Sequence, residues 1–137
     1  MQDFVGVKIA LLNNDRLIVI QRDDKPDINF PGLWDFAGGS REDDETPLEC
    51  VTREVQEELG INLDADTVIF ERIFPAMNQP TKSAYFMVAN VSDEDIKNIQ
   101  FGDEGQGWGF MNINEFFERS DVVPDLKGRL QAYLDLV

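Results

Sequence analysis

The stretch from Thr46 to Gly60 most constrains the fold, because it carries local signals for both ends of a helix. Thr46 can cap the N-terminus, Pro47 suits the first helical position, and Glu49 completes a capping box. Gly60 is the residue type favoured just past a helix C-terminus. The sequence therefore predicts a helix over residues 47–59.

This helix is predicted to have an apolar face and an acidic face. Spacings of three and four place four side chains toward the core, namely Leu48, Val51, Val55 and Leu59. Glu54, Glu57 and Glu58 share another face, where they repel one another and oppose the helix dipole. A divalent cation such as Mg²⁺ takes oxygen ligands and would turn this repulsion into binding. Taken alone, the glutamates would also suit a solvated helix face.

The other elements mix strands and helices without strict alternation. Strands are predicted over residues 5–12, 16–21, 68–74, 84–91 and 107–113, with a short apolar segment over 33–37. A short helix or turn is predicted over 93–99, and helices over 115–119 and 125–136. Pro26, Pro31 and Gly32 mark residues 23–32 as a loop. The favoured class is α/β, with a mixed sheet flanked by helices.

Length and composition favour one cytoplasmic domain. A chain of 137 residues with 42% hydrophobic residues and ten Phe can bury one core. Cys50 is the single cysteine and cannot form an internal disulfide, which suits a reducing compartment. Met1 opens onto Gln2 and Asp3 without the pattern of a signal peptide. No apolar run approaches the roughly 20 residues that a membrane span requires.

The net charge of −15 limits the expected partners. Such a chain is a poor partner for nucleic-acid polymers and for anionic membranes. It would also repel a phosphate compound unless a cation lay between the protein and the phosphate. Solubility alone is the other explanation for the overall acidity.

A longer pattern contains the acidic helix. The chain reads Gly39, five residues, Glu45, seven residues, Arg53-Glu54-Val55, one residue, Glu57-Glu58, one residue, Gly60-Ile61. This sequence of 23 residues with nine specified places resembles the Nudix box at every fixed position. The preceding segment 33–39 resembles the strand and turn before that box, although Ala37 replaces the proline common in MutT-like members.

The resemblance implies a single Nudix hydrolase domain over residues 1–137, with the box at 39–61 and an α/β/α sandwich fold. Glu54, Glu57 and Glu58 would bind the metal together with the carbonyl of Gly38. Glu45 and Arg53 would orient these ligands. Mg²⁺ is the expected cofactor and Mn²⁺ the alternative, because the family uses metals to activate a water for attack on phosphorus.

Residues outside the box extend this prediction. Glu104, in a Glu-Gly-Gln triplet, resembles the loop glutamate that adds a metal ligand in MutT-like members, and either Glu54 or Glu104 would accept the proton. Alternatively, the stretch that contains Glu104 is an acidic surface turn without a role in metal binding. Arg22 is a candidate phosphate contact or a plain surface residue.

Base recognition is assigned to a further set of side chains, each of which could instead be packing. Asp35 and Phe36 could face the pocket from the segment before the box. Trp108 or Phe110 could stack on a base, and Asp125 could recognise the base through its polar side chain.

Three functions are compatible with these residues. The first is a MutT-like diphosphatase that converts a nucleoside triphosphate, normal or oxidised, into a nucleoside monophosphate and pyrophosphate. The second is hydrolysis of ADP-ribose or a nucleotide sugar, for which Pro75 is a weak indication, while the loop over 23–32 could shape the pocket for either kind of substrate. The third is a non-catalytic module that senses a nucleotide. The expected partner is a small nucleotide, and the protein is expected to be a monomer or a homodimer.

Overall fold

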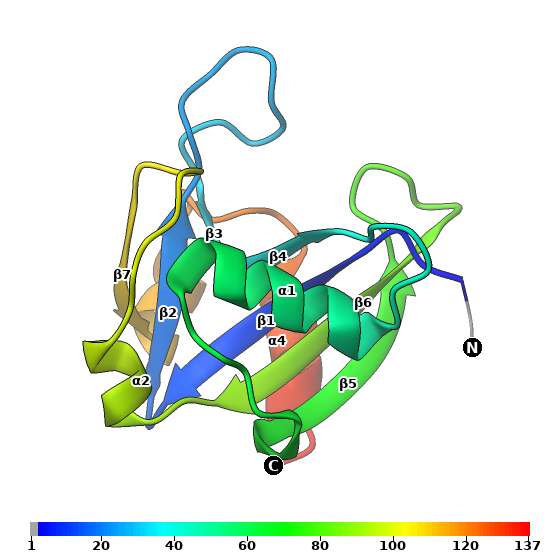
Figure 1. Ribbon diagram of the computed structural model, residues 1–137. Helices are drawn as coiled ribbons and strands as arrows, with labels where there is room; N and C mark the ends of the chain where they lie inside the picture. The colour runs from blue at the N-terminus through cyan, green and yellow to red at the C-terminus, as the bar shows by residue number, and fades with distance from the viewer. Residues whose placement is uncertain (1–2) are drawn as a thin grey trace.

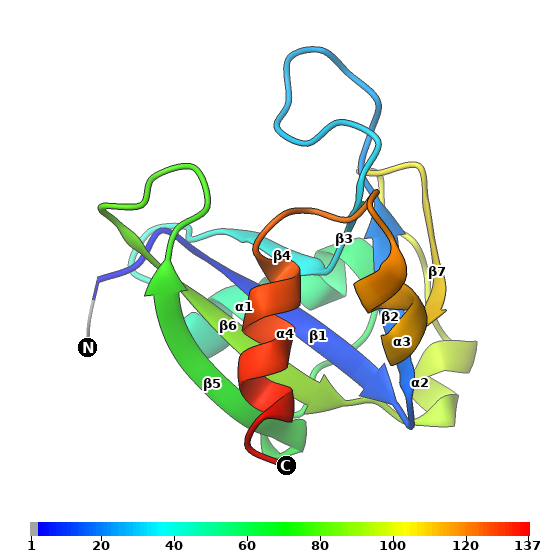
Figure 2. The same cartoon turned by 180° about the vertical axis from the view of Figure 1, so that it is seen from behind.

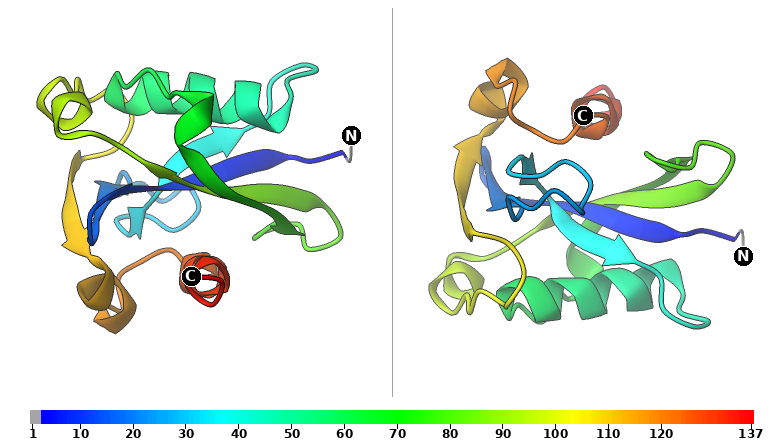
Figure 3. Two further views of the ribbon diagram at one scale, coloured as in Figure 1. Left: turned by 90° about the horizontal axis from the view of Figure 1, so that it is seen from below. Right: turned by 90° about the horizontal axis from the view of Figure 1, so that it is seen from above.

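The computed structural model describes residues 3–137 and shows a mixed sheet between two layers of helices (Figures 1 and 2). Met1 and Gln2, with which the expected domain begins, lie outside the described residues. The end-on views show the sheet edge-on, with α1 (Pro47–Leu59) on one side and the C-terminal helix α4 (Leu126–Leu134) on the other (Figure 3). This arrangement confirms the predicted α/β class.

The sheet is organised around β1 (Gly6–Asn13), which pairs with three other strands. It runs antiparallel to β2 (Arg16–Gln21) and β4 (Ala37–Ser40), and parallel to β6 (Ser83–Asn90). β5 (Val68–Pro75) extends the sheet beyond β6, while β3 (Trp34–Asp35) and β7 (Gly107–Asn112) both pair with β2.

The two faces of the sheet are covered by separate apolar cores. On the α1 side, Val51, Val55 and Leu59 pack against β1 residues such as Ile9. On the opposite side, Leu126 and Leu130 of α4 pack against a different set of strand residues. α3 (Ile113–Glu118) belongs to that second layer. Because the alternate side chains of β1 enter opposite cores, the strand carries the almost continuous apolar sequence of a doubly covered strand.

The helix α1 begins and ends where the sequence predicts. The Thr46 hydroxyl accepts a hydrogen bond from Glu49 N, and the Glu49 carboxylate accepts one from Thr46 N. Gly60 adopts the left-handed conformation, with φ of 69°. Leu48, however, is 38% exposed, and Cys50 is fully buried. The expected core position at Leu48 is therefore wrong, and Cys50 supplies that contact instead.

The predicted segment 33–37 is not one strand. The chain changes neighbours at Phe36, because β3 pairs with β2 while β4 pairs with β1. The Phe36 ring enters the core and stacks on Phe116 with 4.9 Å between ring centroids. Asp35 Oδ1 accepts a hydrogen bond of 2.7 Å from Phe36 N and so supports the bend. Gly38 and Gly39 continue the sheet beyond this segment, because both residues pair with β1.

The remaining elements are short. α2 (Asp93–Lys97) forms a helix over the first part of the segment predicted as a helix or turn, and a 3-10 turn covers Ala65–Thr67. Among the described residues, none of the helices has the length and apolar character needed to cross a bilayer.

Two loops, 22–33 and 101–106, lie beside the acidic face of α1 (Figure 1).

Candidate active site

A cleft of about 900 Å³ opens between the acidic face of α1, the strands β3 and β4, and the loops 22–33 and 101–106. We call it the main cleft. Its lining residues are Lys8, Ile20, Arg22, Asp23, Lys25, Ile28, Asp35, Phe36, Gly38, Gly39, Ser40, Glu42, Arg53, Glu54, Glu57, Glu58, Asp103, Glu104 and Gly105. The structure thus brings together the helix glutamates and Glu104, although they lie far apart in the sequence.

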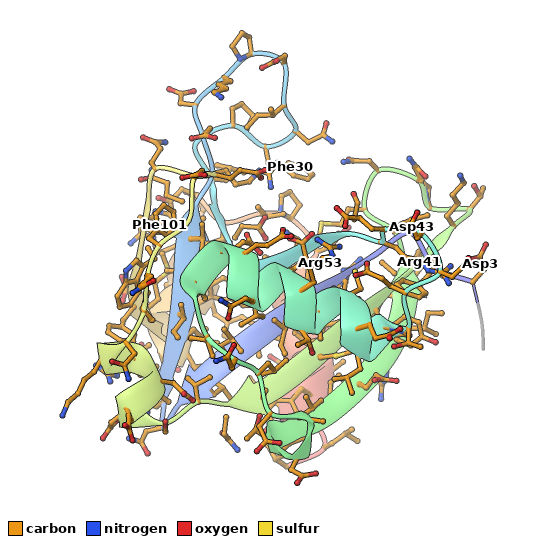
Figure 4. The ribbon with its side chains drawn as sticks, viewed as in Figure 1. Asp3, Phe30, Arg41, Asp43, Arg53 and Phe101 are labelled. Carbon is orange, nitrogen blue, oxygen red and sulfur yellow. The ribbon has the colours of Figure 1, made fainter. Side chains whose placement is uncertain are left out.

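Arg53 organises one wall of the cleft from the face of α1 that is turned toward β4 (Figure 4). Its guanidinium forms a two-pronged contact with Glu45, with Nε–Oε2 at 2.8 Å and Nη2–Oε1 at 3.0 Å. Nη1 donates to Glu54 Oε1 at 2.9 Å and lies 3.3 Å from Glu57 Oε2. Nη2 also donates to the Ser40 carbonyl at 2.9 Å. Arg53 therefore fixes the positions of two cleft carboxylates and ties the helix to β4.

Glu45 holds Arg53 in place from outside the main cleft. The two-pronged contact with Arg53 lowers the pKa of Glu45 to about 2. Glu45 Oε1 also accepts a hydrogen bond from Glu42 N at 2.8 Å. The predicted orienting role of Glu45 and Arg53 agrees with this geometry.

Glu54 and Glu58 are held in a partly dehydrated environment. Burial raises the pKa of Glu58 to about 7, although Glu58 Oε1 accepts a hydrogen bond of 2.7 Å from Gly38 N. Burial also raises the pKa of Glu54, against the opposing effect of Arg53. A carboxylate that loses water is stabilised by a nearby cation. These two groups are therefore placed to gain from binding positive charge.

The glycines before the helix allow the carboxylates to approach the backbone closely. A Cβ atom on Gly39 would lie 2.6 Å from Glu54 Oε1. Gly38 has φ of 141°, and a Cβ there would lie 2.2 Å from the Val7 carbonyl oxygen. Gly38 consequently requires glycine, because its Cβ would meet backbone atoms, whereas a Cβ at position 39 would displace the flexible end of the Glu54 side chain.

A buried ion cluster lines the same cleft as these glutamates. Asp35 is 4% exposed, and its Oδ2 accepts hydrogen bonds from Lys8 Nζ at 2.8 Å and from Arg22 Nη1 at 3.0 Å. Lys8 also donates to the Phe36 carbonyl at 3.4 Å. The cluster therefore places two cations on one buried carboxylate. Arg22 and Asp35 are candidate substrate contacts on sequence grounds, whereas Lys8, the one charged side chain in the apolar run of β1, carries no such signal in the sequence.

Glu104 reaches the cleft on a loop that is anchored to the sheet. Gly105 N donates to Asp23 Oδ2 at 3.3 Å, and Gln106 Nε2 donates to the Arg22 carbonyl at 2.9 Å. Gln106 N also bonds to the Gln21 carbonyl at 2.8 Å. The loop 101–106 is consequently joined to the loop that begins after β2, and both enclose the cleft.

Three expected base contacts have other surroundings. Phe36 borders the cleft but is only 1% exposed, because its ring packs in the core. Trp108 packs against the α1-side core and meets Phe110 edge to face at 5.3 Å. Asp125 lies just before α4 and does not line the main cleft. Base stacking by Trp108 and base recognition by Asp125 stay predictions.

The residues of the cleft fit a divalent cation. Glu54, Glu57, Glu58 and Glu104 offer carboxylate oxygens, which hard cations prefer. Among residues 3–137, no three acidic, Cys or His side chains are already gathered closely enough to enclose an ion. Arg53 instead neutralises part of the acidic wall. Cys50 is no alternative nucleophile, because burial raises its thiol pKa to about 12.

Comparison with known proteins agrees with the fold and the motif. The family model described as NUDIX domain matches residues 3–133. The chain is 33% identical over 63 residues to an 8-oxo-dGTP diphosphatase of Proteus vulgaris, which covers 46% of this chain and 56% of that protein. It is 40% identical over 58 residues to a CTP pyrophosphohydrolase of Escherichia coli K12, which covers 42% of each protein. The aligned part thus spans about half the length of these curated relatives.

Solved structures with low sequence identity share the fold. A bifunctional NMN adenylyltransferase/ADP ribose pyrophosphatase of Francisella tularensis, complexed with AMP and a Mn ion, superposes with a TM-score of 0.77 at 21% identity, covering 98% of this chain and 42% of that one. A MutT protein of Methanosarcina mazei gives 0.73 at 18% identity, covering 98% and 96%. The chain belongs to the Nudix family, and its cleft holds the glutamates of the Nudix box.

Proposed function

We propose that this chain is a divalent-cation-dependent hydrolase of the diphosphate linkage in a nucleoside diphosphate derivative. The most specific form of the proposal is a MutT-like diphosphatase that acts on a nucleoside triphosphate, normal or oxidised. Water would add to one phosphorus while the bond to the bridging oxygen breaks, giving a nucleoside monophosphate and pyrophosphate.

One observation carries this proposal. A single cleft is lined by Glu54, Glu57 and Glu58 from α1, by Glu104 from a distant loop, and by the cations Lys8 and Arg22. Acidic and basic walls on one cleft suit a ligand that is itself a complex of cation and phosphate. The curated relatives named above, an 8-oxo-dGTP diphosphatase and a CTP pyrophosphohydrolase, favour triphosphates as the first substrates to test.

Different residues of the cleft have different roles in this proposal. Glu54, Glu57, Glu58 and Glu104 would hold Mg²⁺ or Mn²⁺, with the Gly38 carbonyl as a further ligand. When bound, such a cation supplies positive charge to the phosphoryl oxygens and makes a nearby water more acidic. Arg53, held by Glu45, keeps the liganding carboxylates in position.

The proton and phosphate contacts come from other residues of the same cleft. Glu54 or Glu104 would take the proton from the attacking water. Lys8 and Arg22 would contact the phosphates, since both line the cleft and Asp35 holds their side chains there.

The proposal is tested by measuring phosphate and pyrophosphate release from a panel of nucleotides with Mg²⁺. The panel contains dNTPs, 8-oxo-dGTP, ADP-ribose, nucleotide sugars and dinucleoside polyphosphates. Glu57→Gln is the informative variant, because the Glu57 side chain is 57% exposed and its loss spares the fold. We expect kcat to fall by about a hundredfold in Glu57→Gln. Glu71→Gln, the same substitution on the exposed face of β5, serves as the control and should match the wild type.

The panel also separates the competing functions. Turnover of ADP-ribose or a nucleotide sugar alone would replace the triphosphate assignment and keep the hydrolase class. Binding of a nucleotide without turnover in Mg²⁺ or Mn²⁺ would instead identify a sensing module. No binding and no turnover on any compound would refute the proposal.

A further inference from the structure

Arg129 is a buried arginine without a direct carboxylate partner among the described residues. It is 3% exposed, and its Nη2 donates to the Pro75 carbonyl at 2.9 Å. Its guanidinium also lies over the Phe74 ring, 5.4 Å from the centroid. Among residues 3–137 no acidic group lies within salt-bridge distance of it. Burying a charge with so few partners costs free energy of folding unless a further hydrogen-bond acceptor or an anion interacts with it.

The unused donors of Arg129 are not sealed inside the protein. Every fully enclosed side-chain nitrogen or oxygen among the described residues has a hydrogen-bond partner. The Arg129 guanidinium has one hydrogen bond, to the Pro75 carbonyl, so its other nitrogens are not fully enclosed, and Arg129 lines a cavity. Burial lowers the pKa of Arg129, which means that the surroundings solvate its charge poorly. The open donors are therefore available to an acceptor on a ligand.

That cavity is a second chamber of about 320 Å³ next to the main cleft. We call it the side chamber. Lys8, Arg22, Asp35, Gly39 and Ser40 line both spaces, so the two are adjoining. A ligand whose phosphates lie beside the acidic face of α1 would extend its other end into the side chamber.

The walls of the side chamber suit a flat neutral ring better than a second phosphate. Phe30, Met77 and Val123 contribute apolar surface to it, and Figure 4 shows Phe30 at the base of the loop 22–33. The two other cations on its wall, Lys8 and Arg22, also line the main cleft, so they lie where the two spaces adjoin. A phosphate would have to lose its hydration among apolar side chains. A neutral nucleobase loses far less hydration free energy in such surroundings, and it still offers hydrogen-bond acceptors to an arginine.

We propose that the side chamber holds the nucleobase of the substrate and that Arg129 selects a purine with a 6-keto group. A 6-keto purine such as guanine presents O6 and N7 as adjacent acceptors, which match two donors of one guanidinium, whereas adenine replaces O6 by an amino donor. The inference rests on the proposed function for the placement of the phosphates. It assigns a specificity-determining residue from α4, outside the Nudix box.

Neutral nucleosides test this selection without metal, phosphate or turnover. Inosine and adenosine differ at the 6-position and in the protonation of the neighbouring N1, so their affinities for the wild-type protein isolate the keto group. Titrations followed by NMR chemical shifts should give a dissociation constant at least tenfold lower for inosine and guanosine than for adenosine. Equal affinities for inosine and adenosine would overturn the inference, whatever the activity assays show.

A variant series identifies the residue responsible. Arg129→Met keeps the length of the side chain and removes the donors, and it should bind inosine no better than adenosine. Arg72→Met, at an arginine of β5 outside both chambers, should keep the wild-type preference. A preference that survives in folded Arg129→Met would refute the role of Arg129. If the wild type selects inosine but hydrolyses no nucleotide, the proposed function fails while the base assignment stands.

Discussion

Replacing Glu45 by Gln should destabilise the protein strongly at neutral pH and weakly in acid. The two-pronged contact with Arg53 lowers the pKa of Glu45 from 4.5 to about 2. Each tenfold change in proton affinity corresponds to about 1.4 kcal/mol, so the ionised form gains up to about 3 kcal/mol on folding. The glutamine of the variant would keep part of the hydrogen bonding, and Arg53 keeps Glu54 as a partner. We therefore expect a loss of about 2 kcal/mol at pH 7.

The pH dependence follows from the direction of this pKa change. Because the folded-state pKa lies below the unfolded value, the stabilisation is complete above pH 4.5 and disappears as the pH falls through 2. Urea denaturation followed by tryptophan fluorescence at pH 7, 5 and 3 measures it. The difference between wild type and Glu45→Gln should fall to less than about half by pH 3.

A matched variant separates this contact from general surface charge. Glu42 also faces Arg53 Nε, at 3.3 Å, but its side chain is 64% exposed. Glu42→Gln should therefore cost less than about 0.5 kcal/mol at pH 7. The reasoning is refuted if Glu45→Gln behaves like Glu42→Gln, or if its effect is the same at pH 3 and pH 7.

Gly38→Ala should lower the melting temperature by at least about 8 °C in calorimetry, because its Cβ would collide with the Val7 carbonyl, and an unchanged value would contradict that clash. Thr46→Ala should cost about 1 kcal/mol in urea denaturation through the lost helix cap, whereas Thr46→Ser should restore it. Asp35→Asn should leave Lys8 and Arg22 without their shared anion, so a Mg²⁺-free titration should show tighter binding of dGTP than in the wild type. An unchanged dissociation constant in a variant whose urea midpoint shows it to be folded would contradict the phosphate-binding role of these two cations.

The sequence predicts best those features that local chemistry determines. The bounds of α1 follow from Thr46, Pro47 and Gly60, whose effects act within one helical turn. The acidic face of the helix also follows from spacing alone, and the structure turns Glu54 and Glu58 toward one cleft. The sequence therefore predicts the acidic wall of the cleft almost completely.

Features that depend on contacts between distant parts of the chain could not be predicted from the sequence. The change of strand neighbours at Phe36 depends on β2 and β1, which pair with β3 and β4 respectively. In the sequence Lys8 is an isolated charge in a buried strand, and its partner Asp35 lies 27 positions away. Arg129 looks like an ordinary polar residue of an amphipathic helix until the fold places it in the side chamber. Spacing along one element carries no information about such contacts.

The strand β4 connects the two halves of the proposed substrate site. Gly39 and Ser40 line both the main cleft and the side chamber, as Lys8, Arg22 and Asp35 do, so a nucleotide that occupies both spaces would lie beside this strand. Any side chain at position 39 would meet the Glu54 carboxylate. The glycine that opens the Nudix box thus leaves room for the Glu54 carboxylate beside the backbone, at a position that lines both spaces. Glutamates from α1 and an arginine from α4, on opposite layers of the sandwich, can then act on one small molecule.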